Sequence, residues 1–455
     1  MNRILINSAR KPFSGLSLAI ALATGTAVLA TAVIPAEAQA QRKKKDKKKD
    51  KKKDEGKASY SDEFVAAYQP LDEALKAEGA DVAALRPQID ALIPLSVSAD
   101  EQIATGGLVY NAGTQAKDQA LQLQGMEMML ASGKVPIEAI GQYNFIAYQL
   151  AAAQKDFTKA RSYLQSAIDT NFTNERVKPA DLKIAMAESY FSAEENAQGL
   201  DYLKRAIAEQ KNQGLPVDQT WYRRGITVAY NYEIVPDVYD FVAGWIADYP
   251  SPENWRDAVN LTRNLNTFEG PEMLDLLRLS KRVDALTEKQ DYILYVEAAD
   301  ARRLPQEVKE LIDQAYAAGA IGRDDTFISD ALRTANDRIA ADRADLPALE
   351  TDARKADAGY RTVLAAGNAF LSYGEYAKAQ EFYTKALDMP GVDKAEALTR
   401  LGIAQIGLSD YDGARETFAK VEGQRVPIAR LWTAFADQQS QPATPGEPAT
   451  ELTGG

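Results

Sequence analysis

The sequence predicts an all-α solenoid, in which antiparallel helix pairs stack in succession. Two segments near the C-terminus share one pattern of small and aromatic residues at an offset of 35 residues. Elsewhere, apolar residues recur at helical spacing, as in Val308-Lys309-Glu310-Leu311-Ile312, and no run alternates convincingly as a β-strand. An internal repeat with helical periodicity indicates stacked helical units, and 455 residues are too many for one compact core.

The first 38 residues have the layout of a secretory signal peptide. Three basic residues precede an uncharged run from Leu16 to Val33, and Ala36-Glu37-Ala38 and Ala38-Gln39-Ala40 both fit a small-x-small cleavage site. The mature chain is then expected to begin at Gln39 or Gln41. An uncleaved N-terminal anchor is the alternative, because the run is about the minimum length for a membrane span. Either interpretation predicts an exported, periplasmic protein.

A lysine-rich tract follows the signal segment. Lys-Lys-Lys-Asp occurs three times from Lys43 to Asp54, and the net charge from Gln39 to Lys57 is +7, against −21 for residues 58–455. Such a block cannot bury apolar surface and is expected to be disordered. Three roles fit this composition: a solvated spacer, an electrostatic tether of Lys43–Lys57 to an anionic membrane or cell-wall surface, and a tail that folds onto the acidic body.

Export of this tract conflicts with the positive-inside rule, which disfavours moving a dense Lys block across the membrane. The cleavage-site chemistry nevertheless favours export. A nucleic-acid partner is not expected, since the body is acidic and the targeting segment directs the chain to the envelope.

The composition excludes several classes of active site. The chain contains no Cys and no His. It therefore has no disulfides, no thiolate nucleophile, no Ser-His-Asp triad and no metal site with Cys or His ligands. We expect no enzyme, no cofactor and no metal. The alternative is a glycan-cleaving enzyme that uses carboxylates alone, which requires two acids facing each other across a cleft.

The repeat is clearest over two units near the C-terminus. In each unit a Gly is followed by a Tyr, an Ala and an aromatic residue, and a Pro closes the unit (Gly367, Tyr376, Ala379, Tyr383 and Pro390; Gly402, Tyr411, Ala414, Phe418 and Pro427). The pattern closely resembles the tetratricopeptide repeat. The small residues are expected where two helices cross closely. Tyr376 and Tyr411 should fill the wedge by the turn, and Tyr383 and Phe418 should pack on the following repeat.

Weaker copies of the motif lie upstream, with a step of 39 residues between Ala160 and Gly199. Trp221 to Gly225 begins a further unit, after which the motif fades until about Tyr360. Three Gly-Pro or Leu-Pro pairs are expected to open helices in this stretch, because Pro suits a first helical position (Gly270-Pro271, Leu304-Pro305 and Leu346-Pro347).

The resemblance implies that a protein or peptide binds in a concave groove lined by the first helix of each pair. The residues that match the groove positions come from three units (Arg361, Leu364, Asn368 and Leu371; Glu396, Thr399, Arg400 and Ile403; Tyr222, Arg223, Ile226 and Tyr230). Asn and Arg donors suit a carboxylate ligand, although the family's clamp uses more basic positions than match here. The other interpretation is that these are ordinary solvated residues.

These observations predict a non-catalytic scaffold or adaptor for one or more envelope proteins, with an electrostatic envelope tether as an alternative. The predicted organisation has six parts: a signal peptide (1–38), the Lys-rich tract (39–58), an N-terminal helical cap (59–135), divergent helical hairpins (136–358), two well-formed repeats (359–437), and a tail (438–455) that lacks helix- or strand-like periodicity and is expected to be disordered.

Overall fold

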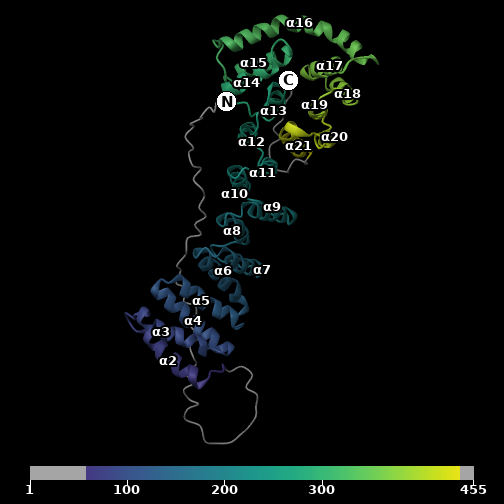
Figure 1. Cartoon of the computed structure of the whole chain (residues 1–455). Helices are drawn as coiled ribbons and strands as arrows, with labels where there is room; N and C mark the ends of the chain where they lie inside the picture. The colour runs from purple at the N-terminus through teal and green to yellow at the C-terminus, as the bar shows by residue number, and fades with distance from the viewer. Residues whose placement is uncertain (1–57, 441–455) are drawn as a thin grey trace, which may run out of the picture. The chain divides into compact units, whose positions relative to one another are not determined.

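The computed structural model describes residues 58–440. The predicted signal peptide, the Lys-rich tract up to Lys57 and the tail from Gln441 onward lie outside the described residues. Within them the chain forms twenty α-helices, two short 3-10 helices (η2, Ile93–Leu95; η3, Gly423–Arg425) and no β-strand (Figure 1). Neighbouring helices pack in pairs, which confirms the predicted all-α solenoid.

The chain divides into two compact units, residues 1–206 and 207–455. The first unit contains a series of helical hairpins, and the last helix crosses the boundary between the units. The helices are α2 (Asp62–Lys76), α3 (Val82–Leu92), α4 (Ala99–Ala116), α5 (Gln119–Ala131), α6 (Ile137–Ala153), α7 (Phe157–Asp169), α8 (Pro179–Ser192) and α9 (Asn196–Asn212).

Helices α4 and α5 approach each other through glycines. A Cβ atom on Gly125 would lie 2.4 Å from the backbone N of Tyr110 and 2.6 Å from the carbonyl O of Gly106. No side chain fits between backbones at this distance, so the close packing of this hairpin depends on glycine.

Glu101 holds the N-terminal end of the described residues in place through hydrogen bonds. Its carboxylate accepts hydrogen bonds from the backbone N and Oγ of Ser61 (2.8 and 2.9 Å) and from the backbone N atoms of Val97 and Ser98 (3.0 and 2.8 Å). Burial raises the pKa of Glu101, but these donors outweigh burial and hold its pKa at about 2. The ionised side chain therefore joins the N-terminus of α2 to that of α4.

The second unit consists of two successive stretches of helices that pack on each other, which we call the outward course and the return course. The outward course contains α10 (Gln219–Asn231), α11 (Val235–Asp248), α12 (Pro252–Leu265), α13 (Gly270–Arg282), α14 (Lys289–Ala299) and α15 (Pro305–Ala317). The 29-residue helix α16 (Thr326–Arg354) leads to the return course, which contains α17 (Tyr360–Ser372), α18 (Tyr376–Leu387), α19 (Lys394–Gly407), α20 (Tyr411–Phe418) and α21 (Val426–Ser440).

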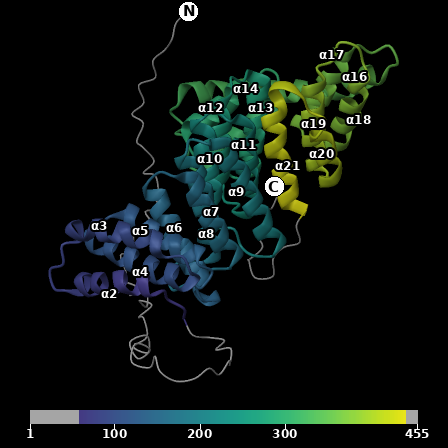
Figure 2. The same cartoon turned by 60° about the horizontal axis from the view of Figure 1, so that its bottom comes forward.

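The return course packs on the outward one. Helix α21 contacts α11 and α13 as well as its neighbour α20, and α19 contacts α13 (Figure 2). Helix α16 is buried at Ile328 and Ala335 near its start and at Ala353 near its end, with no fully buried residue between. It therefore bridges two packed regions of this unit, and the chain reverses across it.

Proline positions test part of the helix prediction. Pro271 and Pro305 lie in the first turns of α13 and α15, as predicted. The prediction for Pro347 is wrong, because this residue lies inside the continuous helix α16. The predicted tail also begins too early, since α21 extends to Ser440.

One turn geometry recurs between paired helices. Lys155, Glu194 and Glu233 all have a left-handed backbone with φ of 57–63°, and the next residue donates its N–H to the carbonyl five residues back (Asp156 to Ala151, Glu195 to Tyr190, Ile234 to Ala229). Gly374 and Ser409 close the turns α17–α18 and α19–α20 in the same way. The repeat is therefore 39 residues long in the upstream hairpins and 35 in the last two.

Candidate functional site

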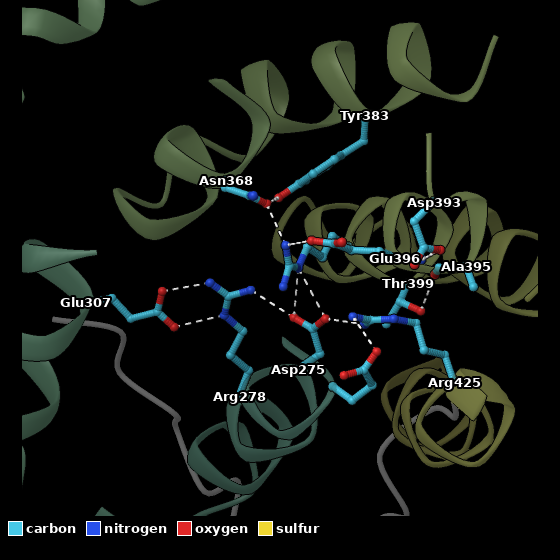
Figure 3. A network of polar contacts seen from close by, with 12 residues as sticks. Asp275, Arg278, Glu307, Asn368, Tyr383, Asp393, Ala395, Glu396, Thr399 and Arg425 are labelled. Carbon is cyan, nitrogen blue, oxygen red and sulfur yellow. Dashed lines mark hydrogen bonds and ion pairs between the residues drawn. The ribbon is translucent and has the colours of Figure 1, made fainter. Parts of the chain in front are cut away.

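A buried network of charged side chains lies where the return course of the second unit meets α13 (Figure 3). Asp275 of α13 is its centre and is 0% exposed. Its carboxylate accepts hydrogen bonds from Arg278 Nη1 at 2.9 Å, from Arg400 Nε at 3.1 and 3.2 Å, and from Arg425 Nη1 at 2.5 Å. Trp432 of α21 donates its indole Nε1–H to the Asp275 carbonyl at 3.0 Å.

Arg278 extends the network toward α15. Its guanidinium binds Glu307 through two parallel hydrogen bonds of 2.8 and 2.7 Å, and Tyr295 donates its hydroxyl to the same carboxylate at 2.8 Å. Two parallel hydrogen bonds between a guanidinium and a carboxylate fix the relative orientation of the two groups in addition to pairing their charges. Helices α13, α14 and α15 are thereby joined to one another.

Arg400 of α19 extends the network in the other direction. It pairs with Glu396 one turn earlier and donates to Asn368 Oδ1 of α17 at 3.0 Å. Tyr383 of α18 donates its hydroxyl to the same Asn368 oxygen at 2.7 Å. Side chains of α17 and α18 thus join the network through Arg400 of α19, which binds Asp275 (Figure 3).

The two fully buried carboxylates, Asp275 and Glu307, are ionised. Burial alone would raise the pKa of Asp275, but the charges of Arg400, Arg278 and Arg425 outweigh it and lower that pKa. Burial would likewise raise the pKa of Glu307, but the charge and hydrogen bonds of Arg278 lower it. Because Arg278 lies between the two carboxylates and donates to both, neither is a proton donor at neutral pH.

Four of the eight predicted groove residues of the last two units are buried. Arg400, Thr399, Leu371 and Ile403 are buried, so the expectation that these four side chains line a groove open to a partner needs correction. The acceptor that Arg400 binds is Asp275 of the same chain. Arg361 is exposed, and the remaining predicted residues are partly exposed (Leu364, Asn368 and Glu396).

The predicted residues of the Trp221 unit divide between core and surface. Tyr222 is 2% exposed, and its hydroxyl donates to Asp248 of α11. Ile226 is partly buried. Arg223 and Tyr230 are exposed on α10, and the Arg223 guanidinium lies 5.5 Å from the ring centroid of Trp245.

The repeat-packing residues lie inside the last two hairpins. Cβ atoms on Gly367 and Gly402 would lie 2.8 and 2.4 Å from the rings of Tyr383 and Phe418, so these rings pack on the preceding helix of their own hairpin. Phe418 also stacks on Trp432 of the next helix. Tyr376, expected in the wedge by the turn, packs on Gly407 of the following unit. Ala379 and Ala414 are fully buried, and Tyr411 is partly buried.

Four residues of the network were not predicted from the sequence: Asp275, Arg278, Glu307 and Arg425. A signal for the first two existed, because they stand within the apolar run Leu274 to Leu279, where a helix face turned toward a core would be uncharged. Nothing local in the sequence pairs them with Arg400 or Arg425.

A cleft of about 610 Å³ opens between α11 and the α20–α21 hairpin. We call it the α11–α21 cleft. Two ion pairs flank it, Arg430 with Asp240 at 3.1 Å and Arg415 with Asp437 at 3.3 Å. The other lining residues are small or apolar for the most part (Tyr239, Ala243, Gly244, Ala247, Phe418, Ala419, Val421, Val426, Ala429, Thr433 and Ala434).

An exposed apolar patch lies at the turn between α10 and α11. Tyr230, Tyr232 and Val235 are 40, 57 and 36% exposed, and we call them the tyrosine patch. Other strongly exposed large apolar side chains of the described residues, such as Val97, stand singly in the sequence. Clustered exposed apolar residues mark interaction sites more often than single ones do.

Residues 58–440 contain neither a cluster of acidic side chains that could hold a metal ion nor a helix long and apolar enough to cross a membrane. Neither a protein-family model nor a curated protein matches the chain.

Proposed function

We propose that the chain is a non-catalytic, tetratricopeptide-type scaffold of the bacterial cell envelope that binds a partner protein through its second unit. The observation that carries the proposal is the tyrosine patch, because tyrosine is enriched in the cores of protein interfaces and buries a large rigid surface on binding. Arg223, a predicted partner-binding residue, is exposed on α10, the helix that carries Tyr230.

The buried network supports this proposal in a second way. The three arginines cross-link α13, α19 and the segment before α21, and α21 in turn packs on α11, the helix that carries Val235 of the patch. A scaffold whose binding surface is fixed in advance loses less conformational entropy when a partner binds. The pairing of Asp275 and Glu307 with Arg278 also gives both buried carboxylates a structural role.

Site-specific photo-cross-linking in intact cells tests the proposal. A photoreactive amino acid replaces Tyr232, and the matched control carries it at Phe327, an exposed apolar residue of α16 that is 43% exposed. We expect reproducible cross-links from position 232 to one or two envelope proteins, lost when the photoreactive residue at 232 is combined with the double variant Tyr230→Ala/Val235→Ala. Equal labelling from both positions, or labelling that survives the double variant, would refute the patch as a binding surface.

A second candidate function rests on the charge of the Lys-rich tract. A net charge of +7 next to an acidic body suits a tether to an anionic envelope surface. Deleting Arg42–Lys57 should then release the protein from the envelope fraction without changing cross-links from position 232. Retention in that fraction would argue against the tether.

A further inference from the structure

One end of the first unit brings together two loops and the point where the described chain begins. Asp100, in the first turn of α4, accepts a hydrogen bond from the backbone N of Ser59 at 3.0 Å and pairs with Lys134 Nζ, in the loop before α6, at 3.1 Å. The connections α4–α5 and α5–α6 are short and the helices that they join pack on each other, so α4 and α6 begin at the same end. We call this the Asp100 end.

Two exposed aliphatic side chains stand at the Asp100 end. Val97 and Ile137 are 79 and 84% exposed, the highest values for large apolar side chains of the described residues. Val97 lies three residues before Asp100, and Ile137 lies three residues after Lys134, so the ion pair brings together two side chains that stand apart in the sequence. Val and Ile are among the residues most often buried, and an exposed pair at one end of a unit indicates a surface that contacts something apolar.

The backbone that carries these side chains is fixed in the folded chain. The backbone N of Val97 donates to Glu101 Oε2 at 3.0 Å, and the other oxygen of this carboxylate accepts a hydrogen bond from the backbone N of Ser61 at 2.8 Å. Ile137 is the first residue of α6. Little backbone entropy is therefore lost when the two side chains meet a partner surface.

The Lys-rich tract joins the described chain at the same end. Its last residue, Lys57, is two residues before Ser59, which binds Asp100 through its backbone N and accepts a hydrogen bond from Ser98 Oγ at 3.1 Å. The net charge of +7 is therefore attached at the Asp100 end. It outweighs the three exposed carboxylates in the first turns of α2 and α6 (Asp62, Glu63 and Glu138).

We propose that the Asp100 end of the first unit rests on an anionic lipid bilayer, with Val97 and Ile137 inserted among the lipid headgroups. Stable attachment to a bilayer surface combines attraction between basic residues and anionic lipid with the burial of apolar groups. The tract supplies the first contribution and the two side chains supply the second. A cell-wall polymer offers charge but no apolar phase, so the aliphatic pair favours a bilayer. The inference rests on the electrostatic tether proposed above and adds the surface of the folded chain that meets the lipid.

Co-sedimentation with vesicles tests the inference on the expected mature chain, Gln41–Gly455. The vesicles contain phosphatidylglycerol and phosphatidylethanolamine in equal parts. Val97→Ser/Ile137→Ser removes the apolar contacts without changing the charge, and we expect it to weaken binding about 10-fold. The matched control, Leu215→Ser/Leu408→Ser, alters leucines of the second unit that are 49 and 43% exposed and should bind like the wild type. Thermal unfolding followed by circular dichroism confirms that both variants are folded.

A fluorescent probe reports insertion directly. The chain has no native Cys, so an environment-sensitive fluorophore can be attached at Val97→Cys or, as the control, at Leu215→Cys. On the same vesicles we expect a blue shift and stronger emission from position 97 and no change from position 215. Deleting Arg42–Lys57 should abolish sedimentation, because the carboxylates left at the Asp100 end are repelled by anionic lipid.

The outcomes separate the tether from the inference. Failure of the unmodified chain to sediment with the vesicles, or sedimentation that survives the deletion, would refute the lipid tether and with it the inference. Sedimentation that the deletion abolishes but that Val97→Ser/Ile137→Ser leaves unchanged would overturn the inference alone. A probe at position 97 that gives no shift on vesicles to which the protein is bound would do the same.

Discussion

Replacing Asp275 with Asn tests whether the buried network holds the two courses of the second unit together. The substitution keeps the size of the side chain but leaves Arg278, Arg400 and Arg425 without their common anion. Removing one partner of a buried ion pair costs about 3–5 kcal/mol, and Asp275 is the partner that all three arginines share, although Glu307 and Glu396 still pair with Arg278 and Arg400. For a unit of this size, the cost corresponds to a melting temperature about 6–20 °C lower.

The tryptophans make the effect easy to assign. All four of them, Trp221, Trp245, Trp255 and Trp432, lie in the second unit. Trp fluorescence during urea unfolding therefore reports on that unit, while far-UV circular dichroism reports on both. We expect Asp275→Asn to shift the fluorescence transition and to leave the first unit's contribution to circular dichroism in place.

A surface pair in the same unit provides the control. Asp330 pairs with Arg333 on α16, and their side chains are 64 and 71% exposed. Asp330→Asn should cost less than about 1 kcal/mol, since exposed ion pairs contribute little. If the two variants differ by less than about 1 kcal/mol in their free energy of unfolding, the network does not hold the courses together.

The pH dependence provides a separate check. The pKa of Asp275 is lowered from 3.8, so its ionised form contributes stability above about pH 4, and that stability is lost as the pH falls through the folded pKa. The gap between the wild type and Asp275→Asn should be constant near neutral pH and shrink in acid. A gap that widens in acid would contradict the assigned ionisation.

Two further predictions concern the first unit and are measured by circular dichroism. Glu101→Gln should cost about 1–3 kcal/mol, because a neutral amide satisfies the four donors poorly. Since the pKa of Glu101 falls from 4.5 to about 2, this loss should be full above pH 4.5 and disappear toward pH 2; a loss independent of pH would contradict it. Gly125→Ala should cost about 1–3 kcal/mol through its clash with the α4 backbone, whereas Gly107→Ala, with open space around it, should stabilise α4 by up to about 1 kcal/mol. Equal effects of the two alanines would show that helix propensity, and not helix packing, sets the outcome.

The sequence by itself determined the class of fold and much of the local geometry. Helical periodicity predicted the helices, and the small residues Ala379 and Ala414 lie fully buried in the last two hairpins. These features are encoded over short separations, because residues three and four apart share a helix face and a turn joins immediate neighbours. The 39-residue spacing of Lys155, Glu194 and Glu233 is a regularity of the same local kind.

Only the tertiary structure decided what Arg400 and its neighbours in the last two repeats contact. Arg400 and Arg425 meet Asp275 across 125 and 150 residues of sequence, after a reversal along α16. A charged residue in a helical repeat has the same local pattern whether it faces solvent, a partner or a distant helix of its own chain. The choice depends on which surfaces complement each other once the helices have formed, and no local period records it.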